Sequence, residues 1–292
     1  MSSQLMLIHC LSPLHAGVGQ GVDVVDLAIA RDRATGLPYL PGSSIKGSLR
    51  DRAYQGKREL LAKVFGPETA NASDHAGCLS FGDGNLVFLP VRSVAGTFAY
   101  VTSPYALQRL SRDLVAAGLP KLDGGFAPKD VETVMVVKDS SLTAQNGTAV
   151  YFEDFNFTPQ SPEGVEKLAD TLANLLFAGD AGQQDLFKKR FCIVHDDVLS
   201  FLAKHATDIV TRVSIENDTK TAKSGQLWTE ENLPSESILV SLVTHIPVSK
   251  TAVDAATAFG EIAEITRTEV QFGGKATVGR GRCRVALSGG AQ

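Results

Sequence analysis

Two aspartates that follow a glycine-rich stretch are the first residues of this sequence suited to a reactive site. Gly17, Gly19 and Gly21 precede Asp23 and Asp26. Carboxylates act as general bases or bind divalent cations, and Mg²⁺ takes only one or two protein carboxylates beside waters and phosphate oxygens. The stretch therefore predicts a site that handles phosphate groups; plain turn aspartates are the alternative.

A basic helix is predicted shortly after these aspartates. Ser43 or Ser44 supplies an N-cap, and the pattern predicts a helix over residues 45–56. Its inward-facing positions are Ile45 and Leu49. Lys46 and Arg50 share another face, and a helix N-terminus with cations nearby can hold phosphate. These two side chains are therefore candidate phosphate ligands.

Local charge favours a nucleic-acid partner although the formal net charge is −4. Phosphate binding needs positive charge, which is concentrated in two stretches. Residues 31–58 carry seven basic and two acidic residues, and residues 267–284 carry five basic and one acidic. Two basic patches on an otherwise acidic protein are typical of a surface that binds nucleic acid on one side. Solvated charged faces are the alternative.

The C-terminal basic stretch contains a glycine run, "GGKATVGRG", over residues 273–281. It matches neither common nucleotide-binding glycine motif. Glycine lets backbone N–H groups approach phosphates closely, with cations alongside. The candidate ligands are Gly273, Gly274, Lys275, Gly279, Arg280, Gly281 and Arg282. A plain β-hairpin turn is the alternative.

The predicted elements follow no strict strand–helix–strand repeat. Strands are predicted at residues 4–10, 27–30, 97–103, 132–137, 149–157, 237–246 and 283–287, and residues 78–93 are predicted to form two strands around a turn at 82–84. Further helices are predicted at 103–118, 161–189 and 252–266. This order favours an α+β fold with an antiparallel sheet over a doubly wound parallel one.

A long hairpin is predicted over residues 208–236. It carries only scattered apolar residues, so it cannot bury much by itself and is expected to project and pack on something else. Lys220 and Lys223 near its turn are candidate contacts to a nucleic-acid duplex. Trp228, the single tryptophan, either stacks on a base or anchors the root of the hairpin.

The sequence shows no evident targeting signal and no cysteine motif typical of a disulfide framework or a zinc site. The N-terminus lacks the basic region of a signal peptide, and no apolar run approaches the ~20 residues of a membrane span. The cysteines form no C-x-x-C pair, which fits core packing in a reducing cytoplasm. They are Cys10, Cys78, Cys192 and Cys283. We expect a soluble cytoplasmic protein without a membrane partner.

Four ordered motifs resemble a known family. They are "HAGVGQG…VDLAIARD…TGLPYLPGSSIKGSLR", "PVRSVAGTFAYVTSPYALQRL", "RVSIENDTKTAKSGQLWTEENLP" and "GGKATVGRGR". Together they resemble the RAMP superfamily of CRISPR-associated proteins, in particular the repeated backbone subunits of type III-B (Cmr) effector complexes. The resemblance covers nearly the whole chain.

The resemblance implies one RAMP domain over residues 1–292. Its parts would be an RRM-like (ferredoxin-like) palm at about 1–60, 78–115 and 237–292, an inserted helical and loop region at about 117–206, and a thumb hairpin at about 207–236. It also implies head-to-tail assembly of copies along a guide (CRISPR) RNA beside other Cmr-type subunits. The paired single-stranded target RNA would be cleaved at regular intervals.

The resemblance implies that Asp26 is the catalytic residue of an endoribonuclease, as base or as ligand of Mg²⁺ or Mn²⁺, with Asp23 as a second ligand. His15 could donate a proton or contact phosphate, because a histidine side chain can exchange a proton near neutral pH; loop capping is its other role. Glu230 and Glu231 would join a composite site only if the thumb reaches Asp26 of a neighbouring copy. Otherwise they are expected to be solvated thumb carboxylates.

The chain departs from the family pattern at several positions. Ala28 replaces a usual proline, residues 30–32 read Ala-Arg-Asp instead of Gln-Arg-Glu, and Thr229 replaces a frequent tyrosine. Because Asp26 is retained, we expect activity to be retained.

Three hypotheses about function follow. The chain is a metal-dependent endoribonuclease that binds guide RNA and cuts paired target RNA, or an RNA-coating backbone without cutting activity, or a metal-independent endoribonuclease that processes the guide.

Overall fold

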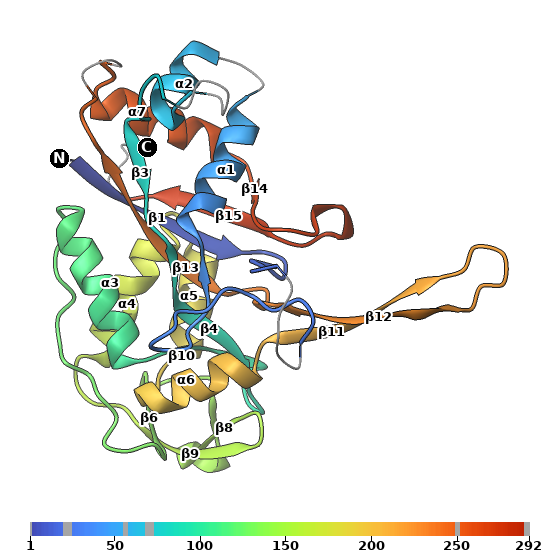
Figure 1. The fold of residues 1–292 in the computed structure, drawn as a ribbon. Helices are drawn as coiled ribbons and strands as arrows, with labels where there is room; N and C mark the ends of the chain where they lie inside the picture. The colour runs from blue at the N-terminus through green and yellow to red at the C-terminus, as the bar shows by residue number, and fades with distance from the viewer. Residues whose placement is uncertain (1, 20–24, 55–57, 68–72, 249–251, 289–292) are drawn as a thin grey trace.

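The computed structural model describes residues 2–19, 25–54, 58–67, 73–248 and 252–288, and Asp23 lies outside these ranges. Within them, no helix has the length and apolar character needed to cross a bilayer. The chain forms an elongated body from which a single long hairpin projects (Figure 1).

Four antiparallel strands form the palm. Strands β15, β1, β13 and β4 are hydrogen-bonded neighbours in that order. Helix α1 lies between β1 and β4 in sequence, and α7 lies between β13 and β15. This β-α-β-β-α-β order is the ferredoxin-like arrangement, so the predicted palm is confirmed. The bounds are β1 (Ser2–Cys10), α1 (Gly42–Ala53), β4 (Gly84–Arg92), β13 (Ile238–His245), α7 (Ala255–Ile265) and β15 (Arg282–Leu287), with β2 (Tyr39–Leu40), α2 (Arg58–Phe65), β3 (Leu79–Phe81) and β14 (Val270–Gln271) beside them.

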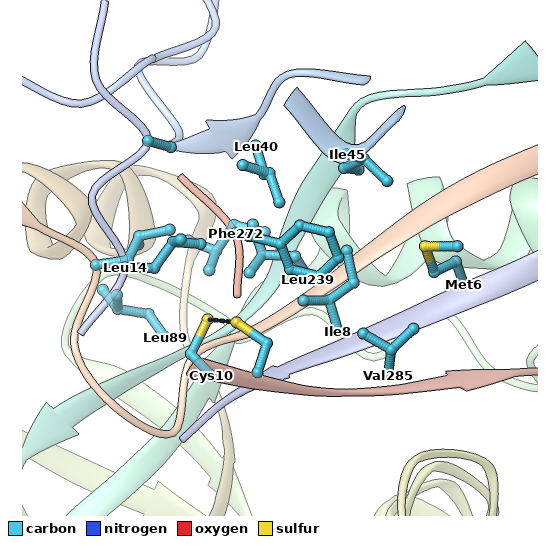
Figure 2. Close-up of a cluster of buried hydrophobic side chains, with 14 of the residues drawn as sticks. Met6, Ile8, Cys10, Leu14, Leu40, Ile45, Leu89, Leu239, Phe272 and Val285 are labelled. Carbon is cyan, nitrogen blue, oxygen red and sulfur yellow. Dashed lines mark hydrogen bonds between the residues drawn. The ribbon is translucent and has the colours of Figure 1, made fainter. Parts of the chain in front are cut away.

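The palm sheet is covered on both faces, because successive side chains of a strand point to opposite sides. Met6 and Ile8 of β1 belong to the same buried cluster as Ile45 of α1 (Figure 2). Phe259 of α7 is part of this cluster as well. Leu5 and Leu7 belong to a second cluster with helices of the inserted region. The inward positions predicted for α1, Ile45 and Leu49, are confirmed.

Helix α1 is capped by tertiary contacts rather than by a serine. It begins at Gly42, before the predicted start, and its N-cap is Pro41, which makes no side-chain hydrogen bond. The N–H of Gly42 instead donates to the carboxylate of Asp83 at 2.7 Å. An added Cβ at position 42 would lie 2.3 Å from the carbonyl oxygen of Phe81, so only glycine fits there.

The inserted region extends the sheet beyond β4 and makes it mixed. Strand β5 is antiparallel to β4, whereas β10 runs parallel to β5, and β6 parallel to β9. The predicted antiparallel pairing therefore holds throughout the palm and for most pairs beyond it, and the two parallel pairs are the exceptions. The helix predicted at 103–118 is confirmed as α3, which Ser103 caps, and the helical stretch predicted at 161–189 forms two helices. The bounds are β5 (Phe98–Thr102), α3 (Pro104–Ala116), β6 (Thr133–Val136), β7 (Thr143–Ala144), β8 (Ala149–Phe152), β9 (Phe155–Gln160), α4 (Val165–Leu176), α5 (Ala181–Arg190), β10 (Phe191–Ile193) and α6 (Asp196–His205).

The cysteines are free thiols packed in the core, as predicted. Cys10 on β1 and Cys283 on β15 are register partners, and their Sγ atoms lie 3.9 Å apart (Figure 2). The contact with Cys283, together with burial, raises the pKa of the Cys10 thiol well above its ordinary value. The thiol of Cys10 therefore stays protonated and unreactive.

The predicted hairpin is confirmed as β11 (Asp208–Ile215) and β12 (Ala222–Asn232), which we call the thumb. It forms a separate two-stranded sheet that extends away from the body (Figure 1). Ile209, Val213 and Leu227 remain exposed on it. The thumb is therefore held to the palm through its root.

A carboxylate fixes the junction between the thumb and β13. Glu236 accepts a hydrogen bond from the hydroxyl of Tyr100 at 2.5 Å and one from Nε2 of His9 at 2.9 Å. Burial raises the pKa of Glu236, but the hydrogen bonds from His9 and Tyr100 outweigh it and hold the pKa below its ordinary value. The chain thus leaves the thumb at a defined position.

Candidate functional site

The segment around Leu27 is bonded to the root of the thumb. The N–H of Leu27 donates to the carbonyl of Thr229, and the N–H of Glu231 donates to the carbonyl of Leu27, both at 3.0 Å. The strand predicted at 27–30 is replaced by isolated bridges, in which Leu27 pairs with Glu230 in parallel. Residues 26 and 27 therefore lie along the outer edge of β12.

Asp26 is attached to the thumb by its own carboxylate. Its Oδ2 accepts the backbone N–H of Thr229 at 2.7 Å and the hydroxyl of the same residue at 2.9 Å. The N–H of Asp26 donates back to Oγ1 of Thr229 at 3.1 Å. The backbone and then the side-chain hydrogen bond from Thr229 lower the pKa of Asp26. The structure thus presents an exposed, ionised carboxylate. Both donors of Thr229 bind its Oδ2, and neither binds its Oδ1.

The expectation that Glu231 is solvated is wrong. Its Oε2 accepts the N–H of Ile29 at 3.1 Å, and its Oε1 accepts the hydroxyl of Thr207 at 2.9 Å and an N–H of Arg31. Arg31 in turn donates to the carbonyls of Gly36 and Ala203 at 2.9 and 2.8 Å. This buried carboxylate therefore joins the segment after Asp26 to the thumb and to the end of α6.

Glu230 is also buried, again contrary to expectation, and it faces the glycine run. Its Oε1 accepts Nε1–H of Trp228 at 2.8 Å and pairs with Nζ of Lys275 at 2.9 Å, while Oε2 lies 3.4 Å from Nε of Arg212. Burial raises the pKa of Glu230, but Trp228, Lys275 and Arg212 lower it below its ordinary value. The indole of Trp228 thus helps to fix Glu230 at the thumb root, and its stacking on a base stays a prediction.

His15 occupies the centre of this assembly. Its Nδ1 lies 2.7 Å from the carbonyl oxygen of Glu231, and because a carbonyl only accepts, Nδ1 carries the proton. Its own carbonyl accepts the N–H of Gly274 at 2.9 Å. His15 therefore links the N-terminal loop, the thumb root and the glycine run in the loop-capping arrangement; its catalytic role stays a prediction.

Replacing Gly17 with alanine should lower the free energy of unfolding by about 1–3 kcal/mol, the usual cost of overpacking. An added Cβ would lie 2.6 Å from Nε2 of His15, a ring that is buried and held by Glu231. Urea denaturation of the chain measures the effect. Gly47→Ala, in open space on α1, is the matched control and should raise stability by about 0.5–1 kcal/mol. Equal stability of the Gly17 variant and the wild type would contradict this packing.

The glycine run approaches the N-terminal loop rather than forming a free loop. Gly273 has a φ of +68°, and a Cβ there would lie 2.3 Å from the carbonyl oxygen of His15. Gly281 has a φ of +74°, and a Cβ there would lie 1.9 Å from the carbonyl oxygen of Phe272. These two glycines are required by close packing. Gly274 and Gly279 are exposed and remain candidates for approach to phosphate.

The cations of the glycine run differ in their partners. Lys275 is engaged by buried Glu230, so its predicted role in RNA binding competes with an ion pair within the chain. Arg282 lies 3.3 Å from Glu269 in an exposed pair, which is weak in water. Arg280 is half-buried, and its Nε is buried without a hydrogen-bond partner among the described residues. Arg280 and Arg282 are therefore the cations of this run best able to meet a phosphate.

Helix α1 brings the two basic stretches together, because Arg52 near its end donates to the carbonyl of Glu269 at 2.5 Å. Lys46 is half-buried on the helix surface, and Arg50 donates through Nη2 to the carbonyl of Pro67 at 2.8 Å. Since a guanidinium has five N–H donors, Arg50 retains others for a phosphate.

The two candidate lysines of the thumb lie far from its root. Lys220 is exposed in the turn between β11 and β12, with a φ of +56°, and Lys223 lies near the start of β12. The fold therefore separates them from Asp26 along the length of the hairpin.

The residues around Asp26 fit a weakly held divalent cation. Among the described residues, no three or more His, Cys, Asp or Glu side chains cluster in a way that could hold a metal ion. A single carboxylate whose Oδ1 is not bonded by Thr229 nevertheless suits Mg²⁺, which keeps several waters and binds substrate phosphates. Asp26 would hold such an ion, while the predicted contribution of Asp23 lies outside the described residues.

Sequence reasoning did not identify three residues that shape this site. In the sequence, Thr229 stands out only as a departure from a family pattern and Arg31 only as one charge of a basic stretch, while no local pattern marks Arg212. Their partners are Asp26, Glu231 and Glu230 respectively. A charge pair separated by two hundred positions leaves no local pattern, so only the fold identifies the Arg31 pair.

Comparison with known proteins gives concordant results. The model of the RAMP superfamily matches residues 7–284. The chain is 34% identical to the CRISPR system Cmr endoribonuclease Cmr4 of Pyrococcus furiosus, over 98% of this chain and 96% of that protein. A crystal structure of oligomeric Cmr4 from Pyrococcus furiosus matches with a TM-score of 0.75 and 28% identity, covering 98% of each chain. A chain of a type III-B Cmr-beta complex bound to cognate target RNA matches with a TM-score of 0.72 and 19% identity, covering 98% of this chain and 97% of that one; it shows likeness of fold alone.

Proposed function

The chain belongs to the RAMP superfamily and is a Cmr4 relative, and on this premise we propose that it is the RNA-cutting backbone subunit of a type III-B CRISPR effector. It would bind guide RNA and cleave the paired target RNA at regular intervals in a metal-dependent reaction. The observation that carries the proposal is the exposed, ionised carboxylate of Asp26, fixed at the root of the thumb.

The chemistry assigned to Asp26 follows from what RNA cleavage requires. In RNA cleavage the 2′-oxygen bonds to the adjacent phosphorus while the bond from phosphorus to the 5′-oxygen breaks, and that leaving oxygen takes a proton from water. The step needs removal of the 2′-hydroxyl proton and neutralisation of charge on the phosphate. Asp26 either accepts the proton or holds the cation. Bound Mg²⁺ or Mn²⁺ would supply positive charge to the phosphate oxygens. A low pKa keeps Asp26 ionised, as both roles require.

The basic surfaces supply the RNA contacts in this proposal. Lys46 and Arg50 on α1, with Arg280 and Arg282, hold guide phosphates without reading sequence. Lys220 and Lys223 press on the guide–target duplex from the thumb. Glu230 and Glu231 are already engaged within the chain, so we assign them no role in a composite site.

The proposed setting is a cytoplasmic ribonucleoprotein. Copies of the chain would assemble head-to-tail along the guide RNA with other Cmr-type subunits. The curated relative is named an endoribonuclease, and a solved relative is described as oligomeric. By similarity to these relatives, we propose that the chain cleaves RNA as a repeated unit of the complex.

A cleavage assay with chelation tests the proposal. The effector purified through this chain should cut a labelled RNA paired with its guide into a ladder of regular spacing. Excess EDTA should abolish the ladder, and added Mg²⁺ or Mn²⁺ should restore it. Binding without cutting in the presence of metal would favour the RNA-coating backbone. Cutting of repeat RNA in EDTA would favour the guide-processing endoribonuclease.

A further inference from the structure

We infer that Thr229 is a positioning residue that fixes the reactive carboxylate of Asp26, an inference that rests on the proposed function. Thr229 lies on β12 of the thumb, two hundred and three positions from Asp26 in the chain. It touches neither metal nor RNA in this role. It acts by holding one oxygen of the carboxylate.

The contact between the two residues is reciprocal. Thr229 donates its backbone N–H and its hydroxyl to Oδ2 of Asp26, and its hydroxyl oxygen accepts the N–H of Asp26. A hydroxyl has one donor and can accept as well, so one side chain serves both purposes. The backbone bonds of Leu27 to β12 hold the neighbouring residue in register. The main chain and the side chain at position 26 are thus both fixed.

Such fixing is needed because Asp26 is exposed. A solvent-exposed aspartate ordinarily samples several staggered rotamers. In-line cleavage requires the reacting groups at near-contact distance and correct alignment, and a misplacement of about 1 Å can cost roughly 10²-fold in rate. Because both donors bind Oδ2, they leave Oδ1 as the oxygen for substrate or cation.

The thumb offers a matched pair of threonines for a test. Thr211 is the register partner of Thr229 across the hairpin. Valine keeps the shape of threonine and removes the hydroxyl, whereas serine keeps the hydroxyl. Comparison of Thr229→Val with Thr229→Ser therefore separates the effect of the hydroxyl from that of side-chain shape. Comparison of Thr229→Val with Thr211→Val separates the effect at position 229 from that of losing a hydroxyl elsewhere on the thumb. The backbone N–H of residue 229 remains in all of them.

The experiment measures single-turnover cleavage of guide-paired target RNA at saturating effector, together with the affinity for that RNA. Each effector is purified with one variant of the chain in place. Thr229→Val should lower the rate constant by roughly 10- to 100-fold at unchanged affinity. Thr229→Ser and Thr211→Val should cut at nearly the wild-type rate.

Each outcome separates the inference from the proposed function. If the Thr229→Val effector cuts at the wild-type rate while the Asp26→Asn effector is inactive, the positioning role of Thr229 is overturned and the proposed function is not. Equal loss in Thr229→Val and Thr229→Ser would also overturn it, because the hydroxyl would then be irrelevant. Wild-type cutting by Asp26→Asn would instead overturn the proposed function.

Discussion

Replacing Asp26 with asparagine is expected to reduce target-RNA cleavage by about 10²- to 10⁴-fold, the range attributed to a positioned acid or base. Asparagine has nearly the shape of aspartate, and its amide oxygen can accept the two hydrogen bonds from Thr229. The loop therefore stays attached to the thumb. What is lost is the negative charge that accepts a proton or binds a cation. Single-turnover cleavage in the purified effector, with Mg²⁺ present, measures the loss.

Asp32 provides the control for this prediction. It is an exposed aspartate in the same segment, and its Oδ1 accepts the N–H groups of Ala34 and Thr35 and the hydroxyl of Thr35. Asp32→Asn should cut at the wild-type rate, and both variants should bind guide and target RNA normally. An Asp26→Asn effector that cuts normally would leave the chain as an RNA-binding backbone.

Replacing Arg31 with methionine should lower the free energy of unfolding by about 2–4 kcal/mol, somewhat less than the loss of one partner of a fully buried ion pair. The side chain of Glu231 is only 6% exposed and that of Arg31 is 23% exposed. Methionine fills a similar volume but leaves the Glu231 charge without its main partner. It also leaves the carbonyls of Gly36 and Ala203 without a donor. Urea denaturation monitored by circular dichroism measures the change.

A double variant shows whether the uncompensated charge is the cause. Adding Glu231→Gln to Arg31→Met removes the charge and should recover part of the lost stability. Arg33→Met, at an exposed arginine of the same segment, should stay within about 0.5 kcal/mol of the wild type. Unchanged stability of Arg31→Met would mean that the pair does not hold the loop.

Local patterns in the sequence predicted those elements whose stability is local. Helix α3 has a serine cap and a proline at its first position, and the structure has both. The thumb was predicted from alternation around a polar turn, and it forms without support from a large core. The order of strands and helices predicted an α+β fold with an antiparallel sheet, whereas the palm was implied by the resemblance to the family.

Structural features that depend on residues far away in the sequence were not predictable. The cap of α1 comes from Asp83, which follows the helix by thirty residues, so the nearby serines were misleading. The parallel pairing of β10 with β5 joins segments about ninety residues apart. Local alternation carries no information about such pairings.

The carboxylates of the thumb show the same limit at the candidate site. Glu230 and Glu231 lie in a polar stretch, where solvation is the ordinary expectation. They are buried because Lys275, Arg212 and Arg31 approach from other parts of the chain. Motif comparison could point to Asp26, but the donors that hold its carboxylate became evident only in the folded chain.

The attachment of Asp26 to β12 couples the carboxylate to the thumb. Asp26 is bonded to Thr229, and the tip of β12 at Ala222 lies roughly 23 Å further out at about 3.3 Å per residue. A rotation of the thumb about its junction with the palm would move both points together, with the larger displacement at the tip. Under the proposed function, RNA or a neighbouring copy that contacts the tip would therefore shift the carboxylate relative to the phosphate by a smaller distance than it shifts the tip.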